Sequence, residues 1–298
     1  MKTSAFRLPL QRLNTPLWSL LLGVSLVLGA WSLEPPAPQP ISLSYKNNTL
    51  TIRAPHVPGK EIQINYLEAY CRAGSTDADW SKHTVVGHKT ETISTAADGK
   101  QIKLRCKVND GLVVEHDIRA VSDGVTFDLT VTNPTDHPNE AQWAQPCIRL
   151  GGFAGGETAD PNGPDIKLDR AFIFLNGKLT TMPTQPWATK ARYTPGQVWC
   201  PKDVPRTDVN PRPLSTLVPD NNLIGCFSSD GKWIFAVTFE PTQELFEGVI
   251  RCLHNDFRIG IVPPGQTKKI RGRIWIIPND SQKLTALHKE WLKALESK

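Results

Sequence analysis

The sequence lacks the local motifs that identify most classes of enzyme. It contains no nucleophile elbow, no glycine-rich phosphate loop and no array of closely spaced metal ligands. No two of its cysteines lie two to four residues apart, which argues against a structural zinc site. The acidic loop that begins at Asp160 does not follow the spacing of a calcium loop, because Pro164 stands at a ligand position. We therefore predict no metal and no cofactor.

A strong net charge is also missing from the body of the chain. The formal charge is +5, but Lys2, Arg7 and Arg12 precede an uncharged segment at 17–33. Without these three residues, 31 basic residues face 29 acidic ones, and no basic run carries interleaved aromatic residues. This balance predicts no nucleic-acid partner.

The uncharged segment at 17–33 predicts export. Basic residues precede it, and the small residues Ala30 and Ser32 close it, which is the pattern of a signal peptide. Its length is also at the lower limit of a bilayer span, so an uncleaved membrane anchor is the alternative. Residues 1–33 are then the leader or anchor, and residues 34–40, EPPAPQP, form a proline-rich linker. We expect an exported protein (periplasmic, secreted or at the cell surface) that meets a membrane only through this segment.

Six cysteines, an even number, permit disulfides in an exported chain, although the sequence does not select a pairing. We expect at least one bridge. The alternative is that several of them are small buried apolar side chains, because Cys106 shares an alternating face with Ile102 and Leu104.

Short alternating runs separated by turn signals predict an all-β fold. Residues 101–133 alternate as three antiparallel strands, and hairpin turns are expected at Asn47-Asn48, Asn176-Gly177 and Asp230-Gly231. Further strands are expected around 249–254 and 269–277. Residues 41–298 should form one large antiparallel β-sandwich domain, closed by an amphipathic helix at 281–296 that is capped by Asp280 or Ser281.

The proline-rich segment 183–222 has no periodic run long enough for a helix or strand. Long loops of this kind are often functional. This one carries four side chains of the kind that grip the faces and hydroxyls of a sugar ring: Trp187, Arg192, Tyr193 and Trp199. The alternative interpretation is that the aromatic residues fasten the loop to the sandwich.

A second candidate site lies in the run CLHNDFRIG. His254, Asp256 and Arg258 would point to one side of an extended strand, because side chains alternate with period two. Together they could bind hydroxyl groups or an anion and could transfer protons. An Asp256–Arg258 pair that ties down a loop is the simpler alternative.

Three stretches resemble the galactose-mutarotase-like β-supersandwich family. GLVVEHDIRAVSDGVTFDLTVTNPTDHP is similar to a strand run that ends in a "VTN" turn, FEPTQELF to a late Glu-x-Gln segment, and VPPGQTKKIRGRIWII to a "PG" turn before the last strand. The resemblance implies a supersandwich fold, a carbohydrate partner and Glu240 as the catalytic base. The family's acid, a histidine after the "VTN" turn, is replaced here by QWAQPCIRL.

Three functions follow as hypotheses. The first is an exported carbohydrate-binding protein with Asp256, Arg258 and the loop residues as ligand contacts. The second is a sugar epimerase-like enzyme in which Glu240 and His254 are catalytic. The third is a structural envelope protein without a small-molecule site. Catalysis and the oligomeric state stay open from the sequence.

Overall fold

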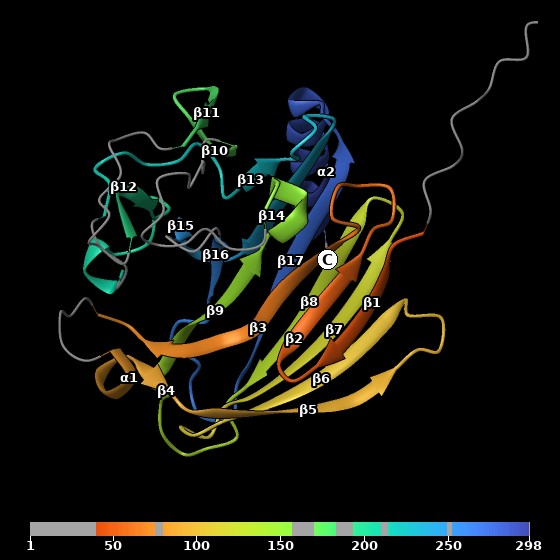
Figure 1. The fold of residues 1–298 in the computed structure, drawn as a ribbon. Helices are drawn as coiled ribbons and strands as arrows, with labels where there is room; N and C mark the ends of the chain where they lie inside the picture. Colours follow the sequence, from red (N-terminus) through yellow and green to blue (C-terminus); the bar gives the residue numbers. More distant parts are fainter. Residues whose placement is uncertain are drawn as a thin grey trace, which may run out of the picture. The chain divides into compact units, whose positions relative to one another are not determined.

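Two antiparallel sheets make up the fold (Figure 1), and their half-exposed strands are built from alternating apolar and polar side chains. The computed structural model describes residues 40–74, 80–156, 170–182, 193–209, 214–248 and 252–297, all within the unit Pro38–Lys298. The predicted all-β sandwich with a C-terminal helix is confirmed, whereas its division from a leader and a linker stays a prediction.

The eight-stranded sheet has the order β1-β2-β3-β9-β16-β15-β12, with β4 paired to β3. Its strands are β1 (Ser42–Lys46), β2 (Thr49–Arg53), β3 (Glu61–Arg72), β4 (Val85–Val86), β9 (Ala141–Arg149), β12 (Tyr193–Trp199), β15 (Thr242–Gly248) and β16 (Cys252–Arg258). The short helix α1 (Trp80–His83) precedes β4.

The nine-stranded sheet has the order β11-β10-β13-β14-β17-β8-β7-β6-β5. Its strands are β5 (His88–Thr95), β6 (Gln101–Val108), β7 (Val113–Val121), β8 (Gly124–Thr132), β10 (Ala171–Leu175), β11 (Lys178–Thr181), β13 (Ile224–Phe227), β14 (Trp233–Glu240) and β17 (Thr267–Pro278). The meander expected at 101–133 is β6, β7 and β8. Two 3-10 turns, η1 (Gly151–Ala154) and η2 (Arg206–Asp208), lie in connections.

The predicted hairpin turns are confirmed. Asn47, Asn48 and Asn176 all have positive φ, which asparagine tolerates better than most residues, and each stands between paired strands. The turn at Asp230-Gly231 likewise joins β13 to β14.

The main core lies between the two sheets and is built from the inward-facing half of each alternation. Leu50, Ile52 and Ile64 of the eight-stranded sheet and Ile102, Leu104 and Val114 of the nine-stranded sheet are among its buried members.

Helix α2 (Ser281–Glu296) covers the other face of the nine-stranded sheet. Leu284 is fully buried there in a cluster that includes Ile234 and Trp275. His288 packs between Trp275 and Trp291, so it is a packing histidine. Asp280 caps the helix by accepting a hydrogen bond from the Lys283 backbone N–H at 2.8 Å.

Two expectations need correction. Segment 183–222 was expected to hold no regular element, but its described part contains β12 and η2, because β12 pairs with β15. The expected disulfide is not formed, since all six cysteines are buried thiols. No helix among the described residues has the length and hydropathy needed to cross a bilayer, and the predicted leader at 1–33 lies outside those residues.

Candidate functional site

The alternation along β16 sends its side chains to two different environments. Leu253 and Phe257 point into the core between the sheets. Cys252, His254 and Asp256 alternate with them and contact one another on the opposite face. The pattern expected for this strand therefore places His254 beside Asp256.

His254 is almost fully buried, and both of its ring nitrogens have protein partners. Nδ1 lies 3.4 Å from Asp256 Oδ1, and Nε2 lies 3.3 Å from Cys252 Sγ. The ring stacks on Phe246 of β15, with centroids 4.1 Å apart and planes 6° from parallel. These contacts fix the orientation of the imidazole and leave it no exposed edge.

Two carboxyl groups face each other across β15 and β16. Glu244 is the register partner of Asp256, and both side chains are fully buried. Burial raises the pKa of Asp256 to about 6, and burial together with the charge of Asp256 raises the pKa of Glu244 well above its usual range. At neutral pH we therefore expect Glu244 to be protonated beside an ionised Asp256.

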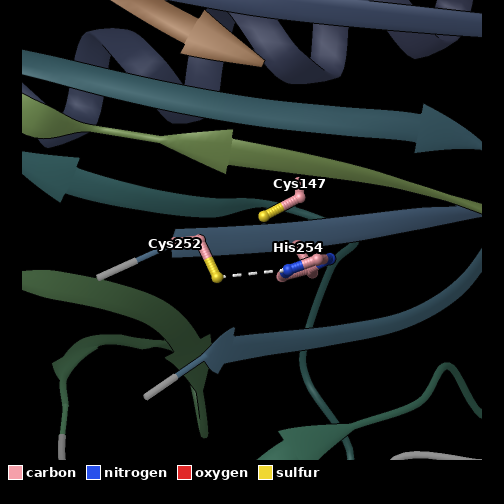
Figure 2. A group of neighbouring side chains, drawn as sticks. All are labelled: Cys147, Cys252 and His254. Carbon is pink, nitrogen blue, oxygen red and sulfur yellow. Dashed lines mark hydrogen bonds between the residues drawn. The ribbon is translucent and has the colours of Figure 1, made fainter. Parts of the chain in front are cut away.

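Cys147 of β9 completes this buried group from the neighbouring strand. Three possible ligand atoms lie within 4.8 Å of one another: the Sγ atoms of Cys147 and Cys252 and a ring nitrogen of His254 (Figure 2). A hydrogen bond from Cys252, and then the charge of His254, lower the pKa of the Cys147 thiol to about 4 despite its burial. Burial disfavours the charged form of His254, but the Cys147 thiolate and Asp256 outweigh it and raise the pKa of His254 to about 10. Two sulfurs and an imidazole at this separation could hold a soft metal ion.

Arg258, at the end of β16, holds the 3-10 turn η2 to the sheet through Asp208. Its guanidinium lies 2.8 Å from Asp208 Oδ2 and donates to Gln243 Oε1 at 2.5 Å. Gln243 Nε2 in turn donates to the Asp208 carbonyl at 3.2 Å. Asp256 does not share this pair, because it lies against His254 instead.

Glu240 is a half-buried carboxylate at the end of β14. Asn222 Nδ2 donates to its Oε2 at 3.0 Å. Burial raises the pKa of Glu240, the bond from Asn222 opposes that shift, and the charge of Asp203 adds to it. Within the described part of the chain, no lysine or arginine lies within salt-bridge distance of this carboxylate.

The structure does not bring Glu240 and His254 into one site. Asn255 Nδ2 donates to the carbonyl of Asn222, the residue that holds Glu240, at 2.6 Å. Asn255 also bonds the β14 backbone, so it points away from the face that carries His254. Glu240 and His254 therefore lie on different sides of β16.

The four side chains of segment 183–222 that are predicted for sugar contact fall into three groups. Trp199 is fully buried in the main core, which corrects its assignment as a ligand contact and supports the alternative that it fastens the segment. Tyr193 begins β12, but its side chain lies outside the described parts of the structure. Trp187 and Arg192 lie wholly outside the described residues.

The group of Cys147, Cys252 and His254 escapes any search for closely spaced cysteines. Its members come from two strands whose pairing is set by the fold, so their proximity has no local sequence signal. The one signal available is the spacing of Cys252 and His254, which places both on one face of a strand.

Comparison with known proteins gives a weak fold likeness. No family model and no curated protein matches the chain. Among solved structures, the Slr1438 protein of Synechocystis sp. PCC 6803 is 10% identical with a TM-score of 0.43, covering 80% of this chain and 96% of its own. A galactose mutarotase-like protein from Lactobacillus casei is 9% identical with a TM-score of 0.38, covering 80% of this chain and all of its own (100%). A galactose mutarotase related enzyme from Lactobacillus acidophilus is 9% identical with a TM-score of 0.37, covering 78% of this chain and 97% of its own. The resemblance inferred from the sequence is thus found among solved structures, as a weak one.

Proposed function

We propose that the protein binds a neutral carbohydrate at Glu240, beside Asn222, and that it binds this ligand without converting it. The observation that carries the proposal is the state of the Glu240 carboxylate, which is half-buried, held by one amide and free of any cation in the described residues. A carboxylate in this state is poorly compensated. Sugar hydroxyls supply the hydrogen-bond donors that it needs without adding charge.

The surroundings of Glu240 support a polar ligand. The backbone N–H of Arg258 donates to the carbonyl of Pro241, the residue after Glu240, at 2.9 Å. The strand residue that pairs with Asp208 therefore has its backbone next to Glu240. The Glu240 carboxylate and the Asn222 amide thus lie at the point where the chain passes from β14 of one sheet to β15 of the other. An acidic sugar is disfavoured, because the charge of Asp203 already opposes ionisation of Glu240.

Binding is favoured over catalysis because the expected acid is elsewhere. A sugar epimerase needs an acid and a base on one bound sugar. His254 lies on the other side of β16, and both of its nitrogens are engaged. The raised pKa of Glu240 does suit a base, which keeps the epimerase-like activity as the second candidate.

Affinity electrophoresis through gels that contain neutral or acidic polysaccharides tests the proposal. We expect retardation by at least one neutral polysaccharide and its loss in Glu240→Ala. Glu115→Ala, which removes an exposed carboxylate of β7, is the matched control and should be retarded like the wild type. Equal mobility of the wild type in every gel would remove the proposal.

Export belongs to the proposal as well, and its support is the leader pattern at 1–33. Expression of the full chain, followed by fractionation and N-terminal sequencing, tests it. A body that stays with the cytoplasmic fraction would contradict export.

A further inference from the structure

We propose that Cys147, Cys252 and His254 form a zinc site on the outer face of the eight-stranded sheet (Figure 2). Two cysteines and one histidine are a known ligand set for zinc, with water in the fourth position. This site is separate from Glu240 and does not depend on the proposed carbohydrate function.

The separation of the three ligand atoms fits a shared metal ion. Zinc bonds of about 2.3 Å to sulfur and about 2.0 Å to nitrogen place tetrahedral ligand atoms roughly 3.5–3.8 Å apart. The three atoms here lie within 4.8 Å of one another, and Cys252 Sγ is 3.3 Å from His254 Nε2. Only small rotations of the side chains are needed to reach bonding distance.

The strand register disfavours a disulfide between the two cysteines. Cys252 pairs with Arg149 and Leu253 with Ile148, which places His254 opposite Cys147. Cys147 and Cys252 are therefore diagonal neighbours, whose Cα atoms are separated by about 7–8 Å in an antiparallel pair. A disulfide requires roughly 4.4–6.8 Å between its Cα atoms. A metal ion can join two sulfurs at a separation that a covalent bond cannot reach.

Asp256 orients the histidine as a ligand. With Asp256 Oδ1 beside Nδ1 at 3.4 Å, the Nδ1 proton is held by the carboxylate and Nε2 is directed at the sulfurs. A carboxylate behind the histidine is the usual outer contact of a zinc-bound imidazole. The same carboxylate has a second oxygen that is buried with no hydrogen-bond partner among the described residues.

The charge of the site selects a divalent ion. Two thiolates and a neutral imidazole carry a charge of −2, and their side chains are at most 3% exposed. Buried charge without compensation is unfavourable. Zn²⁺ neutralises this ligand set, whereas Cu⁺ would leave one negative charge beside Asp256.

Gly248 supplies the space that the Cys252 sulfur occupies. The two residues are register partners, and a Cβ at position 248 would lie 2.5 Å from Cys252 Sγ. Gly248→Ala should therefore displace the sulfur and weaken the site without removing any ligand.

Metal analysis and cobalt spectroscopy of the purified protein test the site. We expect about one zinc per chain after growth in zinc-containing medium. After chelation, Co²⁺ should bind with one equivalent and show a thiolate-to-cobalt absorption band in the near ultraviolet together with four-coordinate bands in the visible. Cys252→Ala should lose both sets of bands, and Cys106→Ala, which removes a buried thiol of β6, should keep them.

Asp256→Asn keeps the test decisive if a cysteine variant does not fold. It retains all three ligands and the side-chain shape, and it should lower Co²⁺ affinity about 10-fold or more. Absence of bound zinc and of cobalt bands in the wild type would overturn the site. Peptide mapping that finds Cys147 linked to Cys252 would overturn it too, as would equal loss of cobalt bands in Cys106→Ala and Cys252→Ala.

Discussion

The Arg258 guanidinium lies 2.8 Å from the carboxylate of Asp208, although the two residues are 50 positions apart in the chain. The side chains are only 20% and 22% exposed, so the pair is better protected from solvent than the Arg105–Glu115 and Arg119–Asp117 pairs. It holds η2 against β15 and β16.

Breaking this pair should destabilise the connection around η2 more than the β-sandwich. Arg258→Ala removes the bonds to both Asp208 and Gln243, and we expect a loss of roughly 1–3 kcal/mol in local stability. Limited trypsin digestion followed by mass spectrometry should show faster cleavage after Lys202 or Arg206. Lys107→Ala, which breaks an exposed pair with Glu91 at 3.7 Å, should leave the rate of cleavage after Lys202 and Arg206 unchanged. Unaltered digestion of Arg258→Ala would contradict this role.

His116 should make the protein less stable in mild acid. It is buried between Tyr66 and Tyr70, with Tyr66 Oη 2.8 Å from Nδ1 and Tyr70 Oη 3.3 Å from Nε2. Burial, with a smaller effect of His88, lowers its pKa to about 3, whereas an unfolded histidine titrates near 6.5. Between these values the unfolded state binds the extra proton, so stability is complete above about pH 6.5 and falls as the pH is lowered towards 3.

Urea unfolding at several pH values measures this effect. The stability advantage of the wild type over His116→Gln should shrink by about 2 kcal/mol between pH 7.5 and pH 5. His137→Gln removes an exposed histidine and serves as the control. An advantage that does not change with pH would show that His116 is not buried in its neutral form.

The helix cap at Asp280 should contribute measurably to stability. Its side chain satisfies the Lys283 N–H, which has no partner within the helix. Asp280→Ala should lower the free energy of unfolding by about 0.5–2 kcal/mol, and Asp280→Asn, which can still accept the bond, should lower it by less. Equal losses in the two variants by urea unfolding would assign the effect to charge rather than to capping.

The sequence predicts those strands that have one buried and one solvent-exposed face, and those that adjoin a strong turn signal. β6, β7 and β8 alternate cleanly, and the three asparagine and glycine hairpins are local. β15 escapes prediction because all of its side chains are buried, including Gln243, Glu244 and Glu247, so no alternation is visible. β12 contains proline and glycine and exists through its pairing with β15.

Contacts in the candidate site are predictable from the sequence only where both residues belong to the same strand. The His254–Asp256 contact follows from period two along β16. The position of Cys147 follows from the β9–β16 register, and the separation of Glu240 from His254 follows from the passage of the chain between sheets at Pro241. The position of Cys147 and the separation of Glu240 from His254 are both set by the tertiary structure, and neither has a signal in the local sequence. Trp199 has the residue type of a sugar contact, but burial assigns it to the core.

The protein should not accelerate the interconversion of sugar anomers. Polarimetry of fresh α-D-glucose and α-D-galactose should give the uncatalysed rate, because His254, the residue expected to act as the acid, lies on the other side of β16 from Glu240. A faster rate that disappears in Glu240→Gln would establish the epimerase-like alternative.

The most direct test of the account is a glycan array that compares the wild type with Glu240→Ala and Glu115→Ala at equal concentration. We expect the wild type and Glu115→Ala to bind the same neutral glycans and Glu240→Ala to bind them about 10-fold more weakly or not at all, as the loss of hydrogen bonds to a charged group predicts. Binding by Glu240→Ala at the wild-type level, or no binding by the wild type to any glycan, would contradict carbohydrate recognition at Glu240.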